Sequence, residues 1–356
     1  MITPRSSGRT GKAFIADRTS FPGTNERGII KEESYSMKTS IIALLLVVVL
    51  AGGLTFGADS LLSYAVRRDA AAAGSGAPPK TSLSREDVLN LSRGWETQSQ
   101  RSKNWLASSS VEKVQIRSAE GFLLSGEAVI TDPASHRWLI AVHGYRGSHS
   151  YMAVPASRFG EENYNALLPD LRGCGESEGR YIGMGWPDRK DMLRWIDWIL
   201  ERDSAAQIVL YGISMGGATV MMTAGEELPD QVRAVVEDCG YTSVTDIFTD
   251  EMKALFHLPA FPLLNIADFL SPFRAGYSFS DASALKQLAH ARVPVLFIHG
   301  SADPLVHTEM VYRVYEACTS EKELLIVDGA GHGNSFAHAP ELYFDTVFRF
   351  LNRYMD

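Results

Sequence analysis

The sequence predicts an α/β protein whose doubly wound, mostly parallel sheet carries a small helical lid and follows a single N-terminal transmembrane helix. Continuously apolar runs such as 138–142 alternate with amphipathic stretches such as 188–202. Buried strands that alternate with helices form parallel sheets covered on both faces. An insertion at about 241–290 interrupts this alternation and predicts the lid, and an uncharged apolar run at 41–58 predicts the membrane helix.

The N-terminal region divides at Met37. Residues 1–36 are polar, mixed in charge and without period, so we expect no structure there. Met37 is also a candidate start of translation, and if translation begins there, residues 1–36 are not part of the protein. The segment 37–58 is about as long as a bilayer is thick and lacks the polar stripe of a soluble helix. We expect a retained single-pass anchor in the cell membrane with the C-terminal domain outside the cell, and secretion after cleavage at Gly57 is the alternative.

A linker and a connecting helix are expected at 59–110. The stretch 69–79 is rich in Ala, Gly, Ser and Pro, which is typical of linkers. The capping-box pattern that begins at Ser84 opens an amphipathic stretch. We expect this helix to end before Trp105.

The remainder, 111–356, is expected to form one domain. The first two strands alternate apolar and polar residues, as edge or antiparallel strands do, and span 111–116 and 122–130. The buried strands are expected at 138–142, 166–170, 208–211, 232–237, 293–298 and 324–327. The helices are expected at 151–162, 188–202, 217–224, 306–317 and 340–354. In the lid, Pro259, Pro262 and Pro272 are expected to separate short helices.

A G-x-S-x-G pentad, Gly212-Ile-Ser-Met-Gly216, directly follows one of the apolar runs and precedes a helix-compatible stretch. In this context the pentad indicates a sharp strand-to-helix turn that leaves its serine exposed at the apex. Gly212 and Gly216 are required because a Cβ atom at either position would collide with the neighbouring strand or helix. Ser214 is therefore the candidate nucleophile.

Further motifs follow in a fixed order. They are H-G-Y-R-G at 143–147, P-D-L-R-G-C-G-E-S-E-G at 169–179, G-I-S-M-G-G at 212–217, H-G-S-A-D-P-L-V at 299–306 and G-A-G-H-G at 329–333. With these motifs the chain from about residue 111 to the C-terminus resembles the α/β-hydrolase superfamily. Within it the chain is most similar to membrane-anchored bacterial hydrolases that carry G-W-P-D-R and E-D-C-G-Y-T-S-V, found here at 185–189 and 237–244.

The resemblance implies a catalytic triad in the order Ser, acid, His. His332 would take the proton of Ser214, because a serine hydroxyl is a poor nucleophile without a base. Asp303 would hold His332 in the right tautomer and stabilise the imidazolium. Asp238, at the end of the preceding strand, is the alternative acid and otherwise a structural carboxylate.

The resemblance also implies an oxyanion hole made by the backbone N–H groups of Tyr145 and Met215. The Tyr145 hydroxyl is a further candidate donor. We expect His143 to pack its loop and Asp170 to be structural.

The activity expected from these residues is that of a serine hydrolase cleaving carboxylic esters through an acyl-enzyme. The substrate is expected to be a small-molecule ester with an apolar acyl group, because the lid is rich in apolar side chains that can line a pocket. These are Phe248, Leu255, Phe256, Leu258, Phe261, Leu263, Leu264, Phe269 and Phe273. The alternatives are a prolyl-oligopeptidase-like peptidase, a thioesterase or acyltransferase, and a membrane-tethered binding protein on a hydrolase scaffold.

Composition argues against other functions. A net charge of −8 and the lack of a dense basic run give no footprint for nucleic acid. Cys174, Cys239 and Cys318 have the spacing of neither a zinc site nor a disulfide framework, and we expect all three to be buried. No cofactor and no metal is expected.

Overall fold

The computed structural model describes residues 26–70 and 85–355, and the chain divides into two compact units between Gly52 and Gly53. Helix α1 (Glu26–Val66) belongs to the first unit up to Gly52 and to the second from there on. Its part Lys38–Val66 has a mean hydropathy of 2.6 and is, among the described residues, the one helix long and apolar enough to cross a membrane.

Helix α1 is longer at both ends than predicted. It begins at Glu26 rather than Met37, so the expectation of no structure was wrong for 26–36. Residues 1–25 lie outside the described residues. The stretch 26–36 has no proline, and extending an existing helix costs far less than starting one.

An eight-stranded sheet forms the centre of the second unit, and the prediction of a mostly parallel, doubly wound sheet is confirmed. The strands run in the order β1-β2-β4-β3-β5-β6-β7-β8, antiparallel in the pairs β1–β2 and β2–β4 and parallel in the others. Their bounds are β1 Ser110–Arg117, β2 Leu123–Ile130, β3 Arg137–Val142, β4 Asn165–Pro169, β5 Gln207–Ile213, β6 Val232–Asp238, β7 Val295–Gly300 and β8 Lys322–Val327.

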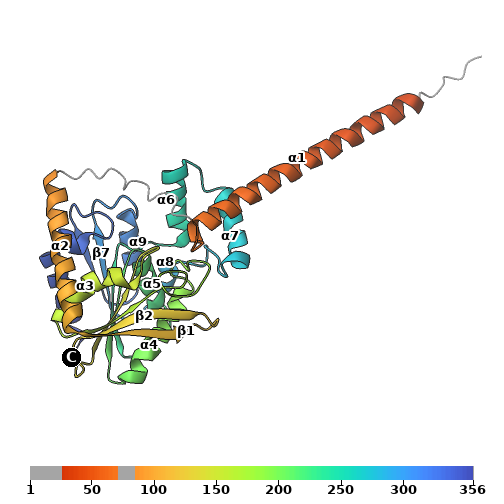
Figure 1. Ribbon diagram of the computed structural model, residues 1–356. Coiled ribbons are helices and arrows are strands. Elements are labelled where there is room, and N and C mark those ends of the chain that lie inside the picture. Colours follow the sequence, from red (N-terminus) through yellow and green to blue (C-terminus); the bar gives the residue numbers. More distant parts are fainter. Residues whose placement is uncertain (1–25, 71–84, 356) are drawn as a thin grey trace, which may run out of the picture. The chain divides into compact units, whose positions relative to one another are not determined.

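Helices cover both faces of the sheet (Figure 1). Side chains of β5 alternate between the two cores, since Ile208 and Leu210 pack on one face and Val209 and Tyr211 on the other. The first face carries α4 (Asp188–Arg202), α5 (Met215–Ala224), α8 (Ala284–Leu288) and α9 (Glu309–Ala317). The second carries α2 (Arg85–Ser108), α3 (His149–Glu161), α10 (Ser335–His338) and α11 (Pro340–Leu351).

Helix α2 continues past its predicted end. Trp105 lies inside the helix, is buried, and donates from its indole nitrogen to the Thr131 hydroxyl at 2.9 Å. Gly160 of α3 makes room for this indole, because a Cβ atom there would lie 2.1 Å from Nε1. The expectation that the helix ends before Trp105 was wrong, because packing against α3 stabilises one more helical turn.

The lid consists of α6 (Val244–Phe256) and α7 (Leu263–Arg274), and α8 follows it. His257 ends α6 in the left-handed conformation, and Pro259 and Pro262 lie in the connection to α7. Pro272 was expected to break the lid but lies inside the last turn of α7. Proline lacks a backbone N–H and crowds the turn before it, so α7 loses a hydrogen bond here and is held instead by its buried side chains Leu264, Ala267 and Ser271.

The last turns of α1 pack on the rest of the second unit, to which they belong. Ala58, Leu62 and Val66 recur every fourth residue and are fully or almost fully buried. The Ile182 N–H donates to the carbonyl of Val66 at 2.7 Å. The region expected to be a linker therefore begins with a packed helical segment.

Candidate active site

Ser214 stands at the turn from β5 into α5. Its backbone has φ 59° and ψ −119°, a strained conformation for a residue with a side chain. The turn is tight, because a Cβ on Gly212 would lie 2.2 Å from the Gly216 carbonyl oxygen and one on Gly216 would lie 2.0 Å from that of Val142. Only glycine fits at these two positions, as the motif predicts.

Three residues from separate loops meet at the carboxyl edge of the sheet. His332 Nε2 lies 2.8 Å from Ser214 Oγ, and His332 Nδ1 lies 2.7 Å from an oxygen of Asp303. The three follow β8, β5 and β7, which are parallel strands of one sheet. This is the hydrogen-bond order that a nucleophile, a base and an orienting acid require.

Asp303 is held as a carboxylate. Its side chain is fully buried, and its Oδ1 accepts from the N–H groups of Leu305 at 2.9 Å and Val306 at 3.0 Å. Oδ2 also lies 3.3 Å from His299 Nε2. Burial by itself would raise the pKa of Asp303, but hydrogen bonds from His299 and His332 outweigh it and hold the pKa well below its ordinary value.

Asp238 lies in a different environment. Its Oδ2 accepts from the Tyr343 hydroxyl at 3.0 Å, and Tyr343 in turn contacts the Tyr211 hydroxyl at 2.9 Å. Its Oδ1 has no hydrogen-bond partner among the described residues. Burial raises the pKa of Asp238 to about 6. The carboxylate that accepts from His332 Nδ1 belongs to Asp303, so the geometry favours Asp303 over Asp238 as the partner of the imidazole.

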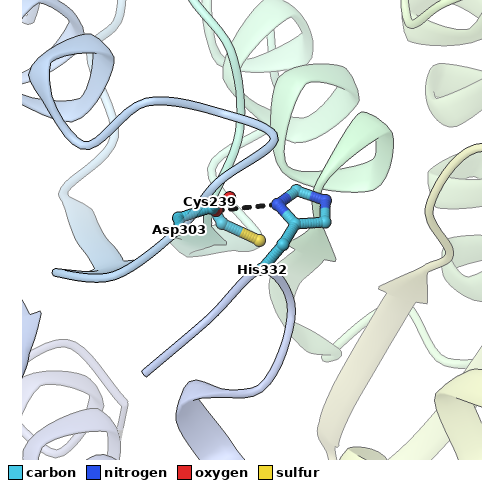
Figure 2. A group of neighbouring side chains, drawn as sticks. All are labelled: Cys239, Asp303 and His332. Atoms are coloured by element: carbon cyan, nitrogen blue, oxygen red, sulfur yellow. Dashed lines mark hydrogen bonds and ion pairs between the residues drawn. The ribbon is translucent and has the colours of Figure 1, made fainter. Parts of the chain in front are cut away.

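Cys239 completes a close group with Asp303 and His332, shown in Figure 2. Their candidate ligand atoms all lie within 4.8 Å of one another. Metal binding requires a thiolate, whereas burial next to the carboxylates Asp238 and Asp303 raises the pKa of the Cys239 thiol well above its ordinary value. The buried thiol therefore suits packing beneath the imidazole better than binding a metal ion.

The loop 143–147 passes beside the serine. A Cβ on Gly144 would lie 3.4 Å from Ser214 Cβ and 3.8 Å from Oγ, which places the following residue, Tyr145, next to the nucleophile. Met215 is the first residue of α5, so its N–H has no acceptor within the helix. The Tyr145 hydroxyl donates to the carbonyl of Ala65 in α1, so it is already engaged away from Ser214.

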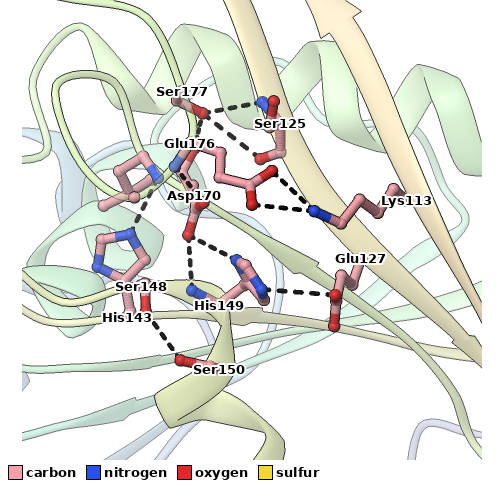
Figure 3. Close-up of polar contacts among 12 residues, drawn as sticks. Lys113, Ser125, Glu127, His143, Ser148, His149, Ser150, Asp170, Glu176 and Ser177 are labelled. Carbon is pink, nitrogen blue, oxygen red and sulfur yellow. Dashed lines mark hydrogen bonds and ion pairs between the residues drawn. The ribbon is translucent and has the colours of Figure 1, made fainter.

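A buried polar network supports this loop (Figure 3). Asp170 is fully buried and accepts from the His149 N–H at 2.6 Å, from His149 Nδ1 at 3.0 Å and from the Glu176 N–H at 2.7 Å. His143 Nε2 accepts from the Leu171 N–H at 3.0 Å, and its Nδ1 donates to the carbonyl of the next residue. Both side chains therefore tie neighbouring loops together, which agrees with the structural roles expected for them.

A cavity of about 550 Å³ opens over Ser214. Its lining includes four side chains of the lid, Phe248, Leu255, Phe256 and Leu264, and one that follows α7, Phe279. A further part of its lining comes from the end of α1 and consists of Leu61, Leu62, Tyr64 and Ala65, which sequence reasoning missed. The available signal was the apolar spacing of 58, 62 and 66, which continues the membrane run into an amphipathic turn.

Two charged residues line the otherwise largely apolar cavity. Arg146 donates to the carbonyls of Tyr64, Arg67 and Ala70, so it fastens the end of α1 to the loop beside Ser214. Glu251 of α6 is partly buried, and this burial raises the pKa of its carboxyl group. No local sequence pattern indicates that either residue faces the site.

Fold and site together define a serine hydrolase of the α/β-hydrolase fold. Residues 151–356, more than half of the chain, match the family model described as the prolyl oligopeptidase family, and the chain belongs to this family.

The chain is also similar to curated relatives and to solved structures. The protein YqkD of Bacillus subtilis is 28% identical over 246 residues, covering 68% of this chain and 79% of the relative. A structure of the Pyrococcus furiosus esterase Pf2001 aligns with a TM-score of 0.58 and 26% identity, covering 70% of this chain and 93% of the esterase. The acetyl xylan esterase of Paenibacillus sp. R4, with a TM-score of 0.55, 17% identity and 78% and 97% coverage, shares the fold.

Proposed function

We propose that the protein is a serine esterase that acts through an acyl-enzyme. The supporting observation is the run of contacts from Asp303 through His332 to Ser214, 2.7 Å and 2.8 Å long, at the floor of an apolar cavity. Ser214 Oγ attacks the ester carbonyl carbon while His332 Nε2 takes the hydroxyl proton. The N–H groups of Tyr145 and Met215 stabilise the oxyanion.

The same residues complete the cycle. The tetrahedral intermediate collapses, the bond between carbonyl carbon and alcohol oxygen breaks, and His332 gives its proton to the departing alcohol. Water then attacks the acyl-serine while His332 takes its proton; the bond between the acyl carbon and Ser214 Oγ breaks, His332 returns the proton to Oγ, and the carboxylic acid leaves. Asp303 stays ionised throughout, in keeping with its lowered pKa.

The acyl group of the substrate is proposed to be apolar. The cavity walls are formed by aliphatic and aromatic side chains from α6, α7 and the end of α1. Covering a hydrocarbon chain with such a wall is favourable in free energy, whereas removing a charged group from water there is unfavourable.

A peptidase is the second candidate, and Glu251 is the observation that favours it. A carboxylate in the cavity can bind the ammonium group of a peptide. Glu251 is the one acidic residue among those that line the cavity, and burial raises its pKa, which disfavours the charged form that would bind an ammonium group. We therefore rank ester cleavage first.

The test compares p-nitrophenyl esters from acetate to palmitate with aminoacyl p-nitroanilides, using the full chain in detergent. We expect burst release of p-nitrophenol and faster cleavage of esters than of anilides, with Ser214→Ala abolishing both the burst and labelling by a fluorophosphonate. Anilides cleaved faster than esters, with a marked loss on Glu251→Gln, would favour the peptidase. Ester cleavage that survives in Ser214→Ala would overturn the proposed mechanism.

We also propose that α1 is a retained single-pass anchor and that the second unit lies outside the cell. The apolar part of α1 supports an anchor. Alkaline carbonate should leave the protein in the membrane fraction, and external protease should digest the second unit in intact cells. A soluble product whose first residue follows Gly57 would instead show a cleaved signal.

A further inference from the structure

Three phenylalanines of the lid point into solvent. Phe261, Phe269 and Phe273 are exposed by 74%, 71% and 79%, and we call this group the lid apex. The rings of Phe269 and Phe273 contact each other, with centroids 5.8 Å apart. None of the three lines the cavity over Ser214, so substrate binding does not explain them.

Helix α7 is apolar on two faces. Leu264 and Ala267 are buried on its inner face, whereas Phe269 and Phe273 lie one turn apart on the outer face. A helix on the surface of a soluble domain carries polar or charged residues on its outer face. Grouped exposed aromatic residues instead mark a surface that meets another apolar phase.

The lid is joined to the end of the apolar helix. A Cβ on Gly57 would lie 3.6 Å from Leu263 Cδ2 at the start of α7. At the other end of α7, Arg274 pairs with Asp59 at 3.0 Å. These contacts all lie within the second unit.

Chain continuity places this junction near the bilayer surface. Crossing the hydrocarbon core takes about 20 helical residues, and the apolar span Lys38–Val66 has 29. Phe56, which is 76% exposed, immediately precedes the contact between Gly57 and Leu263. If the preceding residues cross the bilayer, the lid packed on 57–66 lies at its boundary, because each further helical residue advances the chain by only about 1.5 Å.

We propose that the lid apex inserts into the surface of the lipid bilayer that α1 crosses. Phenylalanine rings at that depth leave water for the acyl region, as the apolar faces of interfacial helices do. Arg274 is half exposed beside Phe273 and is placed to meet lipid headgroups. The inference rests on the proposed anchor and extends it from one helix to a second, independent contact with the membrane.

Insertion would also bring the cavity close to lipid. Leu61, Leu62 and Ala65 line the cavity and belong to the segment that leaves the bilayer. An acyl chain held in the membrane could then reach Ser214 without crossing water. This consequence rests on the proposed esterase function.

The experiment uses the full chain in phosphatidylcholine nanodiscs, with nitroxide spin labels on Phe269→Cys and on Phe273→Cys. The native cysteines are buried, and unmutated protein serves as the labelling control. Leu342→Cys is the matched control, because Leu342 is also an exposed apolar side chain but lies on α11, which packs on the other face of the sheet. Collisions with oxygen and with a water-soluble nickel complex are compared by power saturation.

We expect labels at 269 and 273 to collide more with oxygen than with nickel, as labels in hydrocarbon do, and the label at 342 to show the reverse. Nickel accessibility at 269 and 273 equal to that at 342 would overturn the proposal and leave a protein or a second copy as the occupant. Neither result depends on enzymatic activity.

A kinetic arm tests the consequence for substrate access. The variant Phe261→Ser/Phe269→Ser/Phe273→Ser should hydrolyse a long-chain ester embedded in vesicles at least about tenfold more slowly than the wild type. This loss corresponds to a modest fraction of the free energy gained by burying three phenyl rings. Hydrolysis of soluble p-nitrophenyl butyrate should stay at the wild-type rate. Equal rates on the embedded ester would overturn direct access. Labels that insert while neither ester is cleaved would count against the esterase function alone.

Discussion

At the residue scale, two buried carboxyl groups lie at the ends of neighbouring strands and have different hydrogen-bond partners. Asp303 accepts two backbone N–H groups and contacts two imidazoles, and these contacts hold its pKa below the ordinary value. Asp238 accepts from one phenol, and burial raises its pKa to about 6. A carboxylate that orients a base must remain ionised while the base takes up a proton, and the partners of Asp303 meet that need.

Exchanging each carboxyl for an amide tests this difference. Asp303→Asn should lower kcat by about 10⁴, because the amide favours the wrong tautomer of His332. Asp238→Asn should stay close to wild type, because Tyr343 can still donate to the amide oxygen. Turnover of p-nitrophenyl butyrate gives both values. The opposite pattern would assign the acid to Asp238.

At the element scale, the turn from β5 into α5 brings backbone segments so close together that no side chain fits between them. Ser214 is strained at the turn, and Gly216 faces the carbonyl of Val142 in the neighbouring strand. The strain persists because the sheet on one side and the buried helix on the other hold the turn in place. Rigid elements thus position the nucleophile, and loops supply the residues that contact it.

Adding one methyl group at Gly216 should break this arrangement. A Cβ there would lie 2.0 Å from a backbone oxygen, which no side-chain rotation relieves, so Gly216→Ala should destabilise the protein by about 4 kcal/mol or more. Gly53→Ala is the control, because no atom lies within 4 Å of its added Cβ and alanine favours helix. Urea unfolding in detergent measures both. A wild-type midpoint for Gly216→Ala would show that the turn is looser than described.

At the scale of the whole molecule, the second unit buries acidic groups near the carboxyl edge of its sheet, where the candidate site lies. Glu237 is fully buried next to Asp238, its Oε2 accepts from the Gly240 N–H, and its Oε1 has no hydrogen-bond partner among the described residues. Burial raises the pKa of Glu237 to about 8. The folded protein therefore keeps a proton at neutral pH that the unfolded chain releases.

This proton predicts how stability depends on pH. Between the ordinary glutamate value of 4.5 and about 8 the folded state binds more protons than the unfolded state, so the contribution of Glu237 to stability falls as pH rises. The slope from one group is about 1.4 kcal/mol per pH unit. Glu237→Gln copies the protonated form and should flatten the dependence, whereas the exposed Glu341→Gln should not. Chemical unfolding at a series of pH values measures this, and an unchanged slope in Glu237→Gln would contradict it.

Much of the architecture follows from local pattern. Apolar runs predict the buried strands, and a serine flanked by glycines predicts the strand-to-helix turn, because strand burial and a tight turn each constrain residues that are neighbours in the sequence. Element ends were less predictable. The extension of α2 through Trp105 depends on Gly160 of α3, which lies far away in the sequence.

The sequence by itself determined the parallel sheet, the position of Ser214 in its strand-to-helix turn and the presence of an apolar helix, since each depends on residues that are close together along the chain. Only the tertiary structure decided that Asp303 rather than Asp238 contacts His332, and that the end of α1 forms a wall of the cavity. Both depend on which distant segments pack together. Periodicity reports which side of an element is apolar, but it does not report which element that side will meet.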